Sequence, residues 1–367
     1  MPTDLITDVG RTAGAFTIIT VVAAPVAFAA WSIARFQSQP ILSKWPSPNR
    51  TWTGFDVLCL FGAFFTLLST AIIGLSSGGF FQNFYGSDFP TLLDVSDPDT
   101  NAVVSGTAVI SGLQSRIEVA NQVRFLWASV IAIPLLFVVA GILRMLNQRE
   151  RFVFDVGRLP AQIMLGVLAW MILTPLALIV HLVSVVIASE LGVSADEHPL
   201  MLLALTPGSF DVVLFGFVVC FATPLAEEFL FRGMLLSWMM RGRVRAYIVM
   251  FAAVLLAVAV GRTFESPPHL AAVTFEFLLA VGLVLIVSRV VRGSGRFPVR
   301  TVAAIHVSAA LFAAAHAAVW PSPIPLYFLG LGLGWLTVRT GGIAASTVAH
   351  GLFNAVAFVI LLRGGGN

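Results

Sequence analysis

Long runs of apolar residues recur along the chain and are separated by short polar connections. An α-helix rises about 1.5 Å per residue, so about 20 apolar residues cross the hydrocarbon core of a bilayer. The pattern therefore predicts an all-α, polytopic membrane bundle of about ten transmembrane helices. The predicted spans are Ala13–Ala34, Gly54–Gly74, Phe125–Leu143, Ala161–Ala188, Ser209–Met240, Ala246–Gly261, Leu270–Val290, Thr301–Ala318, Ile324–Val338 and Gly342–Leu362. We expect the long connection from Leu75 to Val123 to be a partly ordered external loop.

The charges of the connections alternate in sign along this series of spans. Every second connection is basic, and these connections hold Arg35, Lys44, Arg50, Arg144, Arg149, Arg151, Arg158, Arg241, Arg243, Arg245, Arg292, Arg296, Arg300 and Arg339. The connections between them hold acidic residues instead, namely Asp88, Asp94, Asp97, Asp99, Asp196 and Glu197. This is the positive-inside pattern, and it predicts that both termini lie outside the cytoplasm.

The composition agrees with a membrane protein and excludes two kinds of partner or site. Hydrophobic residues make up 58% of the chain and charged residues 11%, whereas soluble domains hold about 25% charged residues. The net charge is +3, but the basic residues are scattered, so we expect no nucleic-acid partner. Cys59 and Cys220 both lie inside apolar runs, which predicts neither a disulfide framework nor a cysteine zinc site.

Two adjacent acids, Glu227 and Glu228, lie in the middle of an apolar span. An ionised side chain at the centre of a bilayer costs about 2.5–3.5 kcal/mol on insertion scales, so such residues are usually paired or functional. Glu228 and Arg232 are four residues apart on one helix face and can form an ion pair. Glu227 is rotated from Glu228 by about 100°, which leaves it available for chemistry.

Further polar residues lie inside two later spans. His316 follows Phe312 by four residues, and His350 precedes Asn354 by four. Counting from the basic end of each span at about 1.5 Å per residue puts Glu227 at roughly 21 Å and His316 at roughly 24 Å. The same count puts His350 and Asn354 at roughly 12 and 18 Å. Three spans therefore carry polar groups to overlapping depths.

These residue types suit amide hydrolysis. A carboxylate beside an imidazole can take a proton from water as a general base. An imidazole together with a side-chain amide can donate hydrogen bonds to a developing oxyanion. The sequence shows no positioned serine or cysteine nucleophile, so we predict that water is the nucleophile. We interpret His306, ten residues before His316, as a helix-packing or substrate-side group.

The three motifs resemble those of the CPBP family of membrane-embedded CaaX proteases and bacteriocin-processing enzymes, also called the Abi family. The family pattern EExxxR, FxxxH and HxxxN reads here Glu227-Glu228-x-x-x-Arg232, Phe312-x-x-x-His316 and His350-x-x-x-Asn354. The context is also similar, with Pro224 before the acids and the run Gly330–Trp335 before the last motif. The resemblance covers roughly Pro207 to Leu362.

The resemblance implies roles for these residues. Glu227 and His316 would activate the water, and His350 and Asn354 would form the oxyanion hole. Glu228, Arg232 and Phe312 would support the site. We favour this glutamate mechanism, with no cofactor required, over a metalloprotease in which Glu227, His316 and His350 bind zinc.

The resemblance also divides the chain. Residues 1–200 are predicted to be an accessory transmembrane region of about four helices, and residues 205–363 to be the protease core. About 80 residues separate the first two motifs, where the family is expected to place them on successive spans. The hairpin at 246–291 is therefore predicted to be an insertion.

We thus expect a multi-pass endopeptidase in the cytoplasmic (inner) membrane of a prokaryote, with a protein or peptide substrate and lipid as partners. The resemblance implies CaaX-like C-terminal processing or peptide maturation. Two alternatives remain. The first is a proton- or ion-coupled transporter, in which the buried acids and histidines carry the proton or ion. The second is a catalytically silent immunity or scaffold member of the family.

Overall fold

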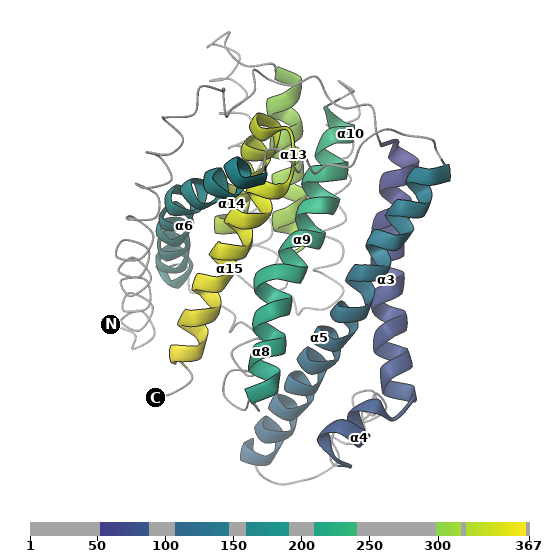
Figure 1. The fold of residues 1–367 in the computed structure, drawn as a ribbon. Coiled ribbons are helices and arrows are strands. Elements are labelled where there is room, and N and C mark those ends of the chain that lie inside the picture. The colour runs from purple at the N-terminus through teal and green to yellow at the C-terminus, as the bar shows by residue number, and fades with distance from the viewer. Residues whose placement is uncertain are drawn as a thin grey trace. The chain divides into compact units, whose positions relative to one another are not determined.

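The computed structural model describes six segments of the chain, and in these every element is a helix (Figure 1). The described segments are residues 52–87, 107–146, 159–190, 209–240, 299–316 and 321–364. They divide into two compact units. The first unit comprises Met1–Val57, Glu150–Asp196 and Glu227–Phe353, and the second comprises Leu58–Arg149, Glu197–Ala226 and Asn354–Asn367.

The second unit is built from long apolar helices and a short aromatic one. Its elements are α3 (Gly54–Ser77), α4 (Phe80–Tyr85), α5 (Thr107–Leu146), α8 (Ser209–Phe217) and the π-helix η4 (Val218–Ala222). Phe81, Leu126 and Phe215 form the centre of one hydrophobic cluster. The Trp127 indole donates a hydrogen bond of 3.0 Å to the Tyr85 hydroxyl, which ties α4 to α5.

The start of α3 shows how local sequence fixes a helix end. The Asp56 carboxylate accepts a bond of 2.7 Å from the Thr53 backbone N–H, while Asp56 N–H donates to the Thr53 hydroxyl at 3.2 Å. These reciprocal bonds form a capping box. Immediately before it, the Trp52 ring meets the edge of Phe229 at 6.1 Å. The chain before α3 is therefore held against the span that carries the two acids.

The span from Ser209 to Met239 is one continuous helix of mixed type. After η4 come α9 (Thr223–Glu227), the π-helix η5 (Glu228–Leu236) and α10 (Ser237–Met239). Glu227 therefore ends the α-helical turn and Glu228 begins the π-helical stretch. Such π-helical segments are frequent at functional sites.

The first unit packs α14 (Pro323–Thr340) between α13 (Val299–Ala314) and α6 (Leu159–Glu190). Glycines permit this close packing. A Cβ at Gly330 would lie 3.0 Å from Ala309 Cβ, and one at Gly334 would lie 3.0 Å from Ile305 Cγ2. Gly332 faces the other way, against the Leu173 side chain.

A tight turn then returns the chain into α15 (Ala344–Gly364). Gly341 has φ 72° and donates its N–H to the Thr337 carbonyl at 3.0 Å. This left-handed cap is a conformation that glycine adopts at little cost. It ends α14 close to the start of α15, which carries His350.

The structure confirms a helical membrane bundle. Four described helices are long and apolar enough to cross a bilayer, namely Gly54–Ser77, Val119–Met145, Leu159–Glu190 and Val212–Met239. Shorter apolar helices cover Thr301–Ala314 and Ala344–Ile360. The chain is an integral membrane protein. Three of the ten predicted spans, Ala13–Ala34, Ala246–Gly261 and Leu270–Val290, lie outside the described residues, so the number of helices stays a prediction.

The expectation of a loop from Leu75 to Val123 was wrong over part of its length. Helix α5 begins at Thr107, well before the predicted span at Phe125, and α4 occupies Phe80–Tyr85. The extension has apolar residues at helical spacing, including Ile110, Leu113 and Ile117, but interleaves them with polar residues. The helix therefore extends past the segment that hydropathy alone identifies.

The packing of α6 on α15 gives a stability prediction. A Cβ at Gly166 would lie 2.6 Å from the Ala345 carbonyl oxygen and 2.7 Å from Val348 Cβ. Because a backbone atom cannot move aside cheaply, we expect Gly166→Ala to destabilise the protein by about 1–3 kcal/mol. Thermal unfolding in detergent measures this.

Gly141→Ala in α5 is the control for the glycine test. A Cβ there meets nothing within 4 Å, so the higher helix propensity of alanine should make the change neutral or stabilising. Equal melting temperatures for the two variants would contradict the close packing of α6.

Candidate active site

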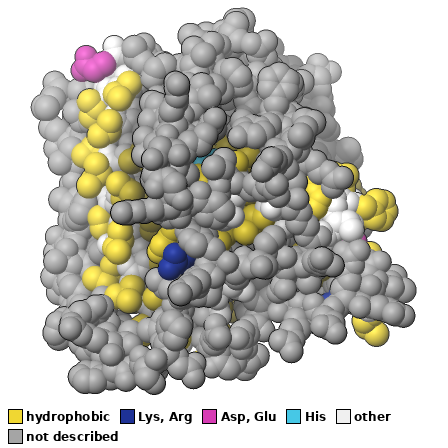
Figure 2. Space-filling model, turned by 90° about the horizontal axis from the view of Figure 1, so that it is seen from above, with side chains coloured by type: hydrophobic (Ala, Val, Ile, Leu, Met, Phe, Trp, Pro, Cys, Tyr) yellow, Lys and Arg dark blue, Asp and Glu magenta, His cyan; other side chains and the backbone are white. Residues whose placement is uncertain are grey.

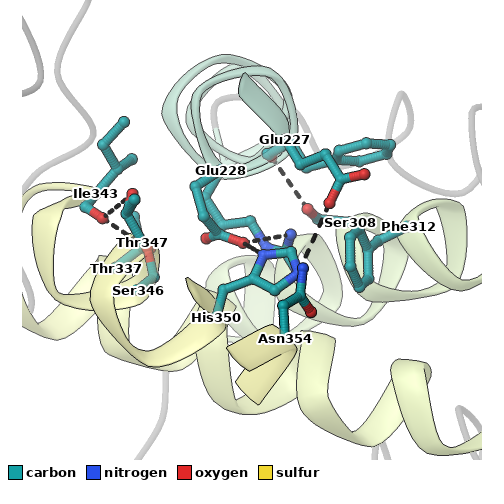
Figure 3. A network of polar contacts seen from close by, with 12 residues as sticks. Glu227, Glu228, Ser308, Phe312, Thr337, Ile343, Ser346, Thr347, His350 and Asn354 are labelled. Atoms are coloured by element: carbon teal, nitrogen blue, oxygen red, sulfur yellow. Dashed lines mark hydrogen bonds and ion pairs between the residues drawn. The ribbon is translucent and has the colours of Figure 1, made fainter. Parts of the chain in front are cut away.

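Glu227, His316 and His350 meet in the first unit, from three separate elements. Glu227 ends α9, His316 lies in the turn after α13, and His350 lies on α15. Glu227 Oε1 is 3.8 Å from His316 Nε2. Glu227 Oε2 is 3.6 Å from His350 Nε2 (Figure 3). The structure thus brings together three residues that the sequence placed at overlapping depths.

The His316 ring is oriented by its own helix. Its Nδ1 atom lies 2.8 Å from the carbonyl oxygen of Phe312, one turn earlier. A carbonyl oxygen only accepts hydrogen bonds, so Nδ1 is the donor and carries the hydrogen. Nε2 is therefore the atom presented to Glu227.

The His350 ring is oriented by the second acid. Its Nδ1 atom lies 3.1 Å from Glu228 Oε1. Glu228 Oε1 also receives Arg232 Nη1 at 2.8 Å in a fully buried ion pair. The carboxylate is thus an acceptor, and Nδ1 of His350 must donate to it. His350 also presents Nε2 to Glu227.

These tautomers leave three acceptors facing one another. A neutral imidazole that is protonated at Nδ1 has a bare lone pair at Nε2. Two such lone pairs and the Glu227 carboxylate repel one another unless a hydrogen-bond donor, an added proton or a cation lies between them. Polar atoms separated by more than about 3.5 Å often share a bridging water. The arrangement therefore suits a bound water whose hydrogens point at a base.

Phe312 supports the site through its ring as well as its carbonyl. The Arg232 guanidinium carbon lies 4.3 Å from the centre of the Phe312 ring. The His350 ring meets the same phenyl group at 5.4 Å and 88°, edge to face. A desolvated cation–π contact contributes about 2 kcal/mol. The ring also lies 4.9 Å from the His316 ring. The Phe of this motif thus contacts the ion pair and both histidines.

A serine that sequence reasoning missed joins α13 to η5. The Ser308 hydroxyl donates a hydrogen bond of 3.0 Å to the Phe231 carbonyl, and both groups are buried. Ser308, Phe312 and His316 follow one another at intervals of four residues. This shared helix face was the available signal, because it places Ser308 on the side that faces the acids.

Exposure separates the members of the site into two groups. Glu228 and Arg232 are 0% exposed and His350 is 2% exposed, whereas Glu227 is 20% and His316 34% exposed. Water and a substrate can therefore reach Glu227 and His316. The ion pair beneath them is closed to both.

Two further predicted residues lie elsewhere. Asn354 belongs to the second unit, where its amide donates to the Val219 carbonyl at 2.9 Å. Its role in an oxyanion hole stays a prediction. His306 lies 2.6 Å from the Tyr327 hydroxyl through Nδ1 and is buried between α13 and α14. That contact fits the packing role expected for it.

Glu227, His316 and His350 would bind zinc in the metalloprotease alternative, but they are not spaced as zinc ligands. Two ligands at bond lengths of 2.0–2.1 Å and a tetrahedral angle lie roughly 3.3 Å apart, which is shorter than the 3.6 and 3.8 Å found here. Within the segments that the structure describes, no group of three or more His, Cys, Asp or Glu residues is placed to hold a metal ion. We therefore derive no step through a metal.

A known protein family matches this part of the chain. The family described as Type II CAAX prenyl endopeptidase Rce1-like matches residues 209–299 and 291–356, which is less than half of the chain. Every predicted site residue, from Glu227 to Asn354, lies in the matched segments. No curated protein and no solved structure matches the chain significantly. Residues 209–356 of the chain are therefore similar to the type II CAAX prenyl endopeptidase family.

Proposed function

We propose that this protein is an endopeptidase that hydrolyses a peptide bond within the membrane with a water molecule activated by Glu227. One observation carries the proposal. The Nε2 atoms of two histidines face the two oxygens of a single, partly exposed carboxylate. This is the arrangement that a general base and its neighbours need in order to hold and deprotonate water.

In the proposed reaction the water lies between Glu227 and His316. Its oxygen attacks the carbonyl carbon of the peptide bond while one of its protons passes to the Glu227 carboxylate. When the resulting tetrahedral intermediate collapses, the carbon–nitrogen bond breaks. Glu227 then returns the proton to the departing amine nitrogen, which restores the carboxylate.

His350 is proposed to donate to the oxyanion, and its tautomer sets a condition on this role. Its Nδ1 hydrogen is used by Glu228, so Nε2 can donate only when the ring carries both protons. We propose Asn354 as the second donor, because an amide nitrogen has two hydrogens and the Val219 carbonyl uses one.

We propose a protein or peptide substrate that is processed in a CaaX-like manner at its C-terminus or matured by cleavage. The family supports a peptide substrate in a membrane context. We propose that the protein lies in a prokaryotic inner membrane, and the alternating loop charges support both termini outside the cytoplasm. The same scattered charges support the absence of a nucleic-acid partner.

Replacing Glu227 tests the proposed base. We expect Glu227→Gln to lower the rate of peptide cleavage by about 10²–10⁴-fold, because an amide cannot accept the proton from water. The melting temperature should stay near that of the wild type, since Glu227 is partly exposed and lies outside the buried ion pair. Mass spectrometry of a model peptide in proteoliposomes measures the cleavage.

Glu190→Gln is the matched control, because Glu190 is an exposed acid at the end of α6. This variant should cleave the peptide at the wild-type rate. The transporter alternative predicts a different result in the same proteoliposomes. The wild type would conduct protons and release no peptide product, and Glu227→Gln would abolish the proton flux. The catalytically silent scaffold alternative predicts that cells carrying Glu227→Ala or His316→Ala keep the wild-type phenotype.

Metal removal tests the glutamate mechanism against zinc. We expect the wild-type protein to keep its cleavage activity after treatment with a strong chelator and dialysis, because no proposed step uses a metal. Elemental analysis of the same samples gives the metal content. Loss of stoichiometric zinc together with activity, and recovery of both on adding zinc, would contradict the proposal.

A further inference from the structure

The second oxygen of Glu228 lacks a hydrogen bond in a closed site. Oε1 receives both Arg232 Nη1 and His350 Nδ1, at 2.8 and 3.1 Å. Oε2 is buried and has no hydrogen-bond partner among the described residues. An unpaired carboxylate oxygen away from water is costly, so such a site calls for a donor.

Ser346 is the neighbouring hydroxyl that can supply that donor. It lies on α15 four residues before His350, and both side chains therefore share a face of the helix. Ser346 is 0% exposed. Figure 3 shows Ser346 beyond Glu228, on the side away from Glu227.

The Ile343 carbonyl, which accepts the Ser346 hydroxyl, has more hydrogen-bond donors than lone pairs. The Ile343 carbonyl accepts the Thr347 N–H at 2.8 Å, the Thr347 hydroxyl at 2.8 Å and the Ser346 hydroxyl at 3.0 Å. A carbonyl oxygen has two lone pairs. The hydrogen bond from Ser346 is the third and the longest of these, so it stabilises the Ile343 carbonyl least.

Thr337 prepares the Ser346 hydroxyl to donate elsewhere. The Thr337 hydroxyl on α14 donates to Ser346 Oγ at 2.9 Å, and both groups are buried. A hydroxyl that accepts one hydrogen bond becomes a stronger donor of the next. Rotation about the Ser346 Cβ–Oγ bond then transfers its hydrogen from the Ile343 carbonyl toward the carboxylate.

We propose that Ser346 and Thr337 are positioning residues for the proposed hydrolysis. Ser346 donates to Glu228 Oε2 and Thr337 supports Ser346, so that Thr337, Ser346, Glu228 and His350 form one buried relay. The proposal rests on the proposed function of His350. It adds two residues that the EExxxR, FxxxH and HxxxN motifs do not contain.

The relay acts by fixing a rotation. The terminal torsions of Glu and His side chains are broad and settle only when their polar atoms are held. With donors at both oxygens, the Glu228 carboxylate cannot turn, and His350 Nδ1 keeps a fixed acceptor. Without Ser346 the Glu228 carboxylate is held at Oε1 alone. The His350 ring can then rotate, and Nε2 no longer points steadily at the reacting atoms.

We expect Ser346→Ala and Thr337→Val to lower kcat by about 10–100-fold, as loss of outer partners of catalytic histidines does, with little change in KM. The reason for this split is that Ser346 and Thr337 are buried, so neither side chain would contact the bound peptide. Thr337→Ser keeps the hydroxyl and should restore kcat. Thr347→Val is the control, because it removes a hydroxyl from the same helical turn that donates to the Ile343 carbonyl. Its kcat and KM should equal those of the wild type.

A spectroscopic measurement separates this relay from the proposed function. The ¹⁵N resonances of His350, assigned with His350→Gln, should shift in Ser346→Ala and stay in place in Thr347→Val, with or without a substrate. Unchanged His350 resonances, or equal kcat values for Ser346→Ala and the wild type, would overturn the relay. Absence of any cleavage by the wild type, with the resonance shift present, would overturn the proposed function alone.

Discussion

The buried ion pair between Glu228 and Arg232 is the interaction on which the site depends. Breaking a buried pair costs about 3–5 kcal/mol, because the remaining charge is left without a partner. Each member of the pair also fixes another group. Glu228 receives Nδ1 of His350, and Arg232 lies over the Phe312 ring. The three sequence motifs are therefore one connected structure.

The neighbouring acids differ through their surroundings. Glu228 is buried and accepts from Arg232 and His350, whereas Glu227 is partly exposed and faces the Nε2 atoms of His316 and His350. Two carboxylates take separate roles when their environments differ in this way. The buried acid orients the histidine, and the exposed acid remains available to take a proton. In the proposed mechanism the two adjacent acids therefore have separate roles, since one carboxylate cannot be both fully paired and free to react.

Intervals of four residues made much of this predictable. They predicted the Glu228–Arg232 pair, and the depth count predicted that Glu227 would meet His316 and His350. The histidine tautomers could not be predicted, because they depend on acceptors from other turns and helices. Ser308 and Ser346 each lie four residues from a motif residue, but that spacing gives only the helix face. It does not show whether the serine has a hydrogen-bond partner across the helix interface, and both residues were therefore missed. The π-helical stretch from Glu228 to Leu236 was likewise hidden, because its i to i+5 bonds leave no pattern in residue type.

The framework of the site reaches beyond the segments that match the family. Helix α6, at residues 159–190, lies outside the match at 209–356. Its Gly166 approaches the backbone of Ala345 at the start of α15, and its Leu173 fills the space left by Gly332 on α14. Rigid supporting elements hold catalytic side chains more accurately than loops do. Because α6 backs the helix that carries His350, the N-terminal region takes part in holding the site in place, and shortening the chain to its family motifs would remove one wall of that framework.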